Sequence, residues 1–181
     1  MQRIDGVIDK MLFPSSKIQS MCDDGSLFRA PLQALLVLGA IGAILLGLKA
    51  VFDGIADAPL IAIGFLVGML GAAQVLLYRR KKIGEAGAGR YPVTPIMSEV
   101  LRGYGEATAV IIAVLGVAIG LQAIFSDVGY MPGVPHDLIR MKFGALFAGP
   151  IAGFIVLSLT HWIVELYQAI VAIANNTAPN D

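Results

Sequence analysis

The chain has 181 residues, of which 57% are hydrophobic and only 14% are charged, and its formal net charge is zero. Soluble domains carry about 25% charged residues, so this composition excludes an ordinary soluble domain. Four stretches without charged residues are each close to the roughly 20 residues that cross a hydrocarbon core. We predict that these stretches are membrane-spanning helices, at Ala30–Leu48, Ala58–Tyr78, Ala107–Ser126 and Phe143–Val164.

Residues 1–12 form an amphipathic pattern ahead of the first predicted span. Ile4, Ile8 and Met11 recur at helical spacing, with Val7 and Leu12 beside them. Such a helix is too short and too polar to cross a membrane. We expect it to lie in the membrane interface or to dock on a partner through Ile4, Ile8 and Met11.

Three short patterns occur in the same order in both halves of the chain. Phe13–Ser20 resembles Tyr91–Ser98, Gly47–Phe52 resembles Gly120–Phe125, and Gly64-x-x-x-Gly68 resembles Gly149-x-x-x-Gly153. A repeated unit of this kind predicts a tandem duplication, with the two halves related by a twofold axis along the membrane normal. Rotation of one half onto the other about this axis should then superpose Gly68 on Gly153 and Phe52 on Phe125.

The predicted fold class is an all-α integral membrane protein of four transmembrane helices, arranged as two tandem-repeat hairpins behind an N-terminal amphipathic interfacial helix. Residues 1–90 would hold that helix, a first interfacial element and a hairpin with spans at about 30–52 and 58–78. Residues 91–181 would hold a second interfacial element, a hairpin with spans at about 107–126 and 143–164, and an apolar cytoplasmic extension of the last helix.

Basic residues are distributed unequally between the two sides of the predicted membrane. Four precede the first span and six lie between the second and third, against three on the other side. They are Arg3, Lys10, Lys17, Arg29, Arg79, Arg80, Lys81, Lys82, Arg90 and Arg102 on the first side, and Lys49, Arg140 and Lys142 on the other. The positive-inside rule therefore predicts that both termini are cytoplasmic, in a bacterial inner (plasma) membrane.

Glycines and alanines four residues apart are present in every predicted span. Small residues at this spacing let helix backbones approach closely in lipid, where apolar surface gives no attraction between helices. We therefore predict tight helix packing, within the chain or between copies, at Gly39, Gly42, Gly64, Gly68, Gly116, Gly120, Gly149 and Gly153.

The last predicted helix continues beyond the membrane. From Phe143 to Ala174 it would measure about 48 Å at 1.5 Å per residue, against a hydrocarbon core of about 30 Å. Its extension presents Leu166, Ile170 and Ile173 on one stripe. An exposed apolar stripe is typical of a surface that binds another protein.

Candidate chemistry is confined to His161 and Glu165. At a spacing of i, i+4 the two side chains could exchange a proton or supply two metal ligands, but the interpretation we favour is a hydrogen-bonded pair at the membrane interface. We find no nucleophile elbow, His-Glu-x-x-His motif, P-loop or dinucleotide-binding fingerprint, and we expect no cofactor. The Arg79–Lys82 run directly follows a span, so it is interpreted as a lipid-headgroup anchor rather than as a nucleic-acid contact.

These patterns favour a non-catalytic structural or accessory subunit of a membrane complex or homo-oligomer. Its partners would be the lipid bilayer and other membrane subunits or copies of itself, with no nucleic acid and no soluble small-molecule substrate. The alternative is a small channel or transporter with a pore between protomers, lined by Gln33, Gln74 and Gln122. A membrane enzyme is a third hypothesis, which depends on His161 and Glu165 alone.

Overall fold

The computed structural model of the protein describes residues 21, 25–52, 58–85, 93–125 and 142–177. These residues contain four long helices: α3 (Ser26–Phe52), α4 (Pro59–Glu85), α5 (Val93–Phe125) and α7 (Lys142–Thr177). Each is long and apolar enough to cross a membrane, which confirms the prediction of an all-helical protein with four candidate spans. The N-terminal amphipathic segment, including Ile4, Ile8 and Met11, lies outside the described residues.

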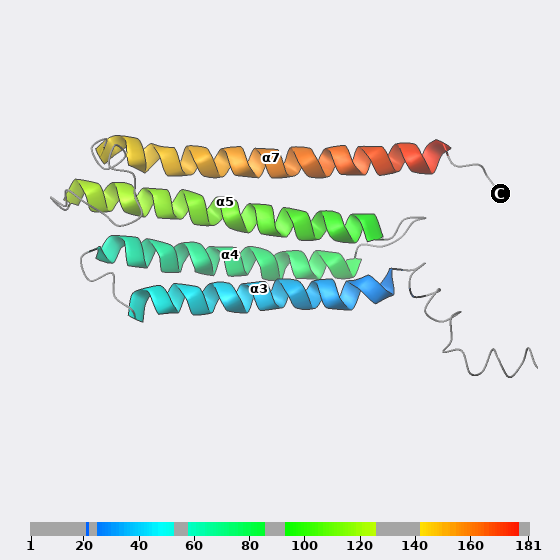
Figure 1. The fold of residues 1–181 in the computed structure, drawn as a ribbon, viewed down its shortest axis with the longest axis horizontal. Helices are drawn as coiled ribbons and strands as arrows, with labels where there is room; N and C mark the ends of the chain where they lie inside the picture. Colours follow the sequence, from blue (N-terminus) through cyan, green and yellow to red (C-terminus); the bar gives the residue numbers. More distant parts are fainter. Residues whose placement is uncertain (1–20, 22–24, 53–57, 86–92, 126–141, 178–181) are drawn as a thin grey trace, which may run out of the picture.

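The four helices lie in an antiparallel row in which each packs against the next in the chain (Figure 1). α3 also touches α5, whereas α7 lies at the edge of the row beside α5. We call the end of the row that holds Arg79–Lys82 the basic end; there α4 ends and α5 begins. α7 extends past the other helices at this end (Figure 1).

The apolar core lies between α3, α4 and α5, mainly toward the basic end. Leu36, Ile83 and Ile96 are completely buried there. Around them the core is lined mostly by alanines, such as Ala40 and Ala72, which keep the helix axes close together. Outside the core many large apolar side chains are exposed, as expected for helices that face lipid.

α5 is longer than the third predicted span at about 107–126. It is a single continuous helix of 33 residues, about 50 Å long, whose first part includes residues that precede that span. Glu99, Arg102 and Glu106 precede the apolar stretch in the sequence. Glu99 and Glu106 bind Arg79 of α4, and Arg102 pairs with Glu99 within α5, so the helix can continue through these charged residues.

The closest backbone approaches lie between α5 and α7. A Cβ at Gly116 would overlap the backbone of Gly149, and a Cβ at Gly149 would overlap Gly116. A Cβ at Gly153 would lie 2.7 Å from the Ala109 carbonyl oxygen, and one at Gly120 would lie 2.6 Å from the Leu146 Cα. At each of these positions only glycine lets the two backbones meet.

The predicted packing glycines on α3 and α4 differ in how closely a neighbouring helix approaches them. A Cβ at Gly64 would overlap the Ala118 side chain, one at Gly39 would lie 3.0 Å from the Tyr104 hydroxyl, and one at Gly68 would lie 3.4 Å from the Ile111 Cα. Gly42 is the exception, because a Cβ there would meet no described atom within 4 Å. It lies on the outer side of α3, between the exposed Leu38 and Leu45.

The two glycine motifs of the proposed repeat have different contacts. Gly64 and Gly68 of α4 pack against α5 from one side, and Gly149 and Gly153 of α7 pack against α5 from the other. These contacts do not show the twofold relation of the two hairpins, and the tandem repeat stays a prediction.

Candidate functional site

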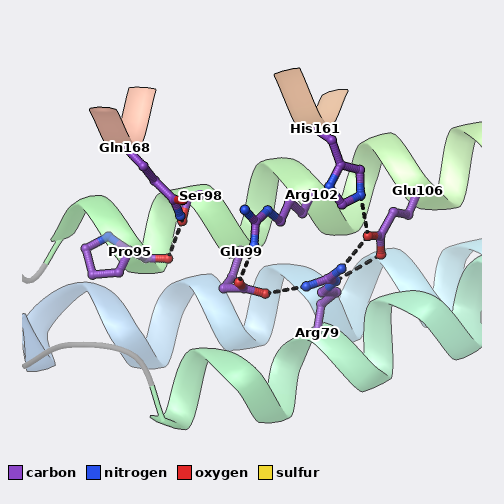
Figure 2. A network of polar contacts seen from close by, with 8 residues as sticks. All are labelled: Arg79, Pro95, Ser98, Glu99, Arg102, Glu106, His161 and Gln168. Atoms are coloured by element: carbon purple, nitrogen blue, oxygen red, sulfur yellow. Dashed lines mark hydrogen bonds and ion pairs between the residues drawn. The ribbon is translucent and has the colours of Figure 1, made fainter. Parts of the chain in front are cut away.

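Arg79 on α4 is the centre of a polar cluster that joins three helices at the basic end (Figure 2). Its Nε donates to Glu106 Oε2 at 2.9 Å while Nη2 pairs with Glu106 Oε1, so the guanidinium binds this carboxylate through two nitrogens. Its Nη1 donates to Glu99 Oε2 at 2.7 Å. One arginine thus bridges two carboxylates of α5, with the bidentate geometry that a lysine could not reproduce.

The spacing of Glu99 and Glu106 along α5 places both carboxylates on the face that Arg79 contacts. Glu99 and Glu106 are seven residues apart, which places them on the same face about 10 Å from one another. Gly103 lies between them, and a Cβ there would be 3.3 Å from Arg79 Cβ and 3.4 Å from its Cγ. The missing side chain makes room for the arginine stem, so the guanidinium can reach both carboxylates.

α7 joins the cluster through His161. Its Nε2 lies 3.1 Å from Glu106 Oε1. Because a carboxylate only accepts hydrogen bonds, Nε2 carries the hydrogen of this bond. The close approach of α7 depends on Gly105, since a Cβ there would overlap the side chain of Thr160, the neighbour of His161.

Two further contacts extend the cluster along α5. Arg102 Nη1 lies 3.4 Å from Glu99 Oε1, and Gln168 of α7 donates to the Ser98 hydroxyl at 3.1 Å (Figure 2). The side chains of Arg79, Glu99 and Glu106 are only 11%, 13% and 16% exposed. Two arginines therefore compensate two glutamates in surroundings that are largely shielded from water.

The structure separates the two residues of the predicted chemical site. His161 contacts Glu106 across the helix interface, whereas Glu165 is exposed, and no hydrogen bond or ion pair joins them within the described part of the chain. The i, i+4 spacing identified a pair that was possible on an isolated helix. It did not take into account that a carboxylate on the neighbouring helix lies closer to the imidazole.

Arg79, Glu99 and Glu106 were the residues that the sequence analysis missed as a site. Hairpin geometry could have found them, because residues equally far from the connection of two antiparallel helices face each other. Arg79 lies six residues before the end of α4, and Glu99 lies six residues after the start of α5. In the same way Glu106 lies 19 residues before the end of α5, and His161 lies 19 residues after the start of α7.

The chemistry of the cluster is that of a set of compensated charges. Glu106 accepts from Arg79 and His161, and Glu99 accepts from Arg79 and Arg102, so both carboxylates already have cationic or N–H partners. Among the described residues no group of three or more His, Cys, Asp or Glu side chains is placed to hold a metal ion. The cluster can therefore connect α4, α5 and α7 and fix how far each helix is shifted along its axis relative to the others.

The three glutamines of the channel hypothesis have separate surroundings. Gln122 is 2% exposed, and its side-chain oxygen accepts from the Leu60 N–H at 3.0 Å, which caps the first turn of α4. Gln33 donates to the Arg80 carbonyl oxygen at 3.4 Å. Gln74 is exposed on α4.

The predicted partner surface on α7 is exposed. Leu166, Ile170 and Ile173 are 50%, 56% and 64% exposed, and the helix continues to Thr177. Val164 just before them is completely buried, while Leu159 and Trp162, which precede it, are also exposed, so at this level α7 has one buried and one exposed side.

Four apolar helices of this length suggest a membrane location for the protein. Comparison with known proteins gives no further assignment, since no family model, curated protein or solved structure matches the chain.

Proposed function

We propose that this protein is a non-catalytic structural or accessory subunit that assembles with itself or with other subunits in the membrane. The single observation that carries the proposal is the exposed apolar surface of α7 at and beyond the basic end. In this proposal the polar cluster lies at the membrane boundary. Leu166 lies beside the cluster contacts of His161 and Gln168, and Ile170 and Ile173 continue the apolar surface of α7 past them. Each such side chain contributes about 1.5–3 kcal/mol when it is buried, so this surface favours assembly.

The polar cluster supports a structural role. Its two glutamates are occupied by Arg79, Arg102 and His161, whereas a transport or catalytic carboxylate must be able to bind a substrate, a proton or an ion. The contacts of Gln122 and Gln33 with backbone groups likewise favour the structural role over a pore lined by glutamines.

The proposed orientation places the basic end on the cytoplasmic side of a bacterial inner (plasma) membrane. Arg80 and Lys81 are exposed at this end, where they can contact anionic lipid headgroups. Tyr78 and Trp162, 56% and 62% exposed, lie near the same level and are suited to the interfacial aromatic belt. Both termini would then be cytoplasmic.

Native mass measurement in a mild detergent tests the proposal. We expect the full-length protein to form a species larger than its 19.1 kDa chain. Truncation after Gln168 retains the hydrogen bond to Ser98 but removes Ile170 and Ile173, and should reduce that mass while the four spans remain inserted. A full-length protein that has the mass of a single chain would contradict the proposed function.

A further inference from the structure

α7 has two faces of different character. Toward α5 it presents Gly149 and Gly153, which meet that helix closely, and the buried Val164. On the opposite side a continuous line of apolar residues is exposed, which we call the α7 seam: Ile155, Leu159, Trp162, Leu166, Ala169 and Ile173. Val164 lies two residues from both Trp162 and Leu166, half a helical turn or more around the axis.

The seam follows a heptad repeat. Its members are spaced alternately four and three residues apart, and the same spacing continues backwards to Ala152 and Ala148. This alternation is the pattern of a and d positions in a coiled coil, in which a second helix packs along the stripe at a small angle. The five large residues of the seam are between 50% and 64% exposed.

The length of the seam restricts its occupant. Gln168 contacts Ser98, which lies five residues after the start of α5, so Ile173 lies at about the level where α5 begins, while Ile155 lies well within the candidate span. A partner that covers the whole seam must therefore be an apolar helix that runs from within the span to the level where α5 begins. Among the described helices only α5 approaches α7 in length, with 33 residues against 36, and it is already enclosed between α4 and α7.

A second copy of α7 has the required properties. In a dimer with its twofold axis along the membrane normal the two helices are parallel, so each seam residue meets its own counterpart and both helices extend equally far. From Leu146 to Thr177 the one acidic residue is Glu165 and there is no Lys or Arg. Glu165 lies beside the seam rather than in it, so the two copies bring no like charges face to face.

We propose that the α7 seam pairs in parallel with the α7 seam of a second copy of this chain. This inference rests on the proposed function and makes it specific, because it names the partner and the surface. Trp162 and Leu166 meet their counterparts in the other copy at the level of the polar cluster, and Ile173 extends the contact beyond it.

Disulfide cross-linking in native membranes tests the pairing. The single cysteine is first removed by Cys22→Ser, and Leu166→Cys and Ile173→Cys are then introduced separately. Both positions are exposed, so the variants should fold. The matched controls are Tyr167→Cys and Ala174→Cys, which are also exposed but lie about 100° farther around the helix. A disulfide requires Cα atoms within about 7 Å, which a parallel seam provides only at the first two positions.

We expect oxidation to give a cross-linked species of twice the chain mass for Leu166→Cys and Ile173→Cys, at least five times more than for either control. No cross-link at the seam positions, or equal cross-linking at all four, would overturn the pairing. In that case native mass separates the two proposals. A mass above one chain would retain the proposed function with another contact surface, and a mass of one chain would remove both.

Discussion

Arg79 and Arg80 show how differently two adjacent residues of one basic run are used. Arg79 is directed between α4 and α5, with a side chain that is 11% exposed, while Arg80 is exposed at the surface. Successive residues of a helix are rotated by about 100°, so one of them can enter the interface while the next contacts headgroups. The headgroup interpretation of the Arg79–Lys82 run is therefore replaced for Arg79 by an internal ion-pair role.

Arg79→Met should destabilise the protein substantially. It would leave Glu99 and Glu106 without the guanidinium that compensates them, and removal of one partner from a buried ion pair costs about 3–5 kcal/mol. Thermal unfolding in detergent measures the effect, with Arg80→Met as the matched control because its side chain is exposed. Neutralising the acids by Glu99→Gln and Glu106→Gln in the Arg79→Met protein should recover part of the loss. Equal unfolding temperatures for Arg79→Met and Arg80→Met would show that the cluster contributes nothing to stability.

At the scale of the helices, α5 determines the architecture. It receives α4 on one side and α7 on the other, and both contacts use small residues. The α5–α7 contact is the closer of the two, because Gly116 and Gly149 bring backbone against backbone. The same approach places His161 within hydrogen-bonding distance of Glu106, so packing in the span and the polar cluster support each other.

Gly149→Ala should weaken the α5–α7 contact. The added methyl group would overlap Gly116, and the two backbones would have to separate at a cost of about 1–3 kcal/mol. The unfolding temperature in detergent should fall. Gly42→Ala is the control, since a Cβ there meets no described atom within 4 Å, and alanine has the higher helix propensity. Equal effects of the two substitutions would mean that the close approach of Gly116 and Gly149 is not needed for stability.

For the whole molecule, the open row of helices suits a component of an assembly. α7 has one neighbour in the row, and α3 lies at the other edge. A row exposes more helix surface than a closed bundle does. In lipid this surface can bind further helices through close packing, because contacts with lipid tails are exchanged for contacts with equally apolar side chains.

The reconstituted protein should not dissipate a proton or sodium gradient faster than empty liposomes do. Conducted ions need a polar or ionisable site along the membrane interior. The ion pairs between the described helices are formed by Arg79, Glu99, Glu106 and His161, and all of them lie near the basic end. The measurement is a fluorescent-dye flux assay on proteoliposomes. Robust flux that Glu106→Gln abolishes would contradict the structural role and would make the cluster a transport site.

Much of the architecture could be predicted from the sequence alone. Charge-free stretches of about 20 residues must form helices in lipid, because the backbone has no water to satisfy its hydrogen bonds. The ends of the Gly47–Phe52 and Gly120–Phe125 patterns coincide with the ends of α3 and α5. The apolar continuation after Glu165 likewise corresponds to the length of α7, which ends at Thr177.

The polar cluster and the order of the row were decided by tertiary structure. In the sequence Glu99, Arg102 and Glu106 mark the end of an apolar stretch, because their charges are costly in lipid when they are considered singly. Only the alignment of α4, α5 and α7 brings Arg79 and His161 to those carboxylates and makes a continuous helix possible. Glycine motifs likewise indicate that helices can approach closely, but not which helix each will meet. That choice depends on contacts between segments far apart in the chain, which no local pattern encodes.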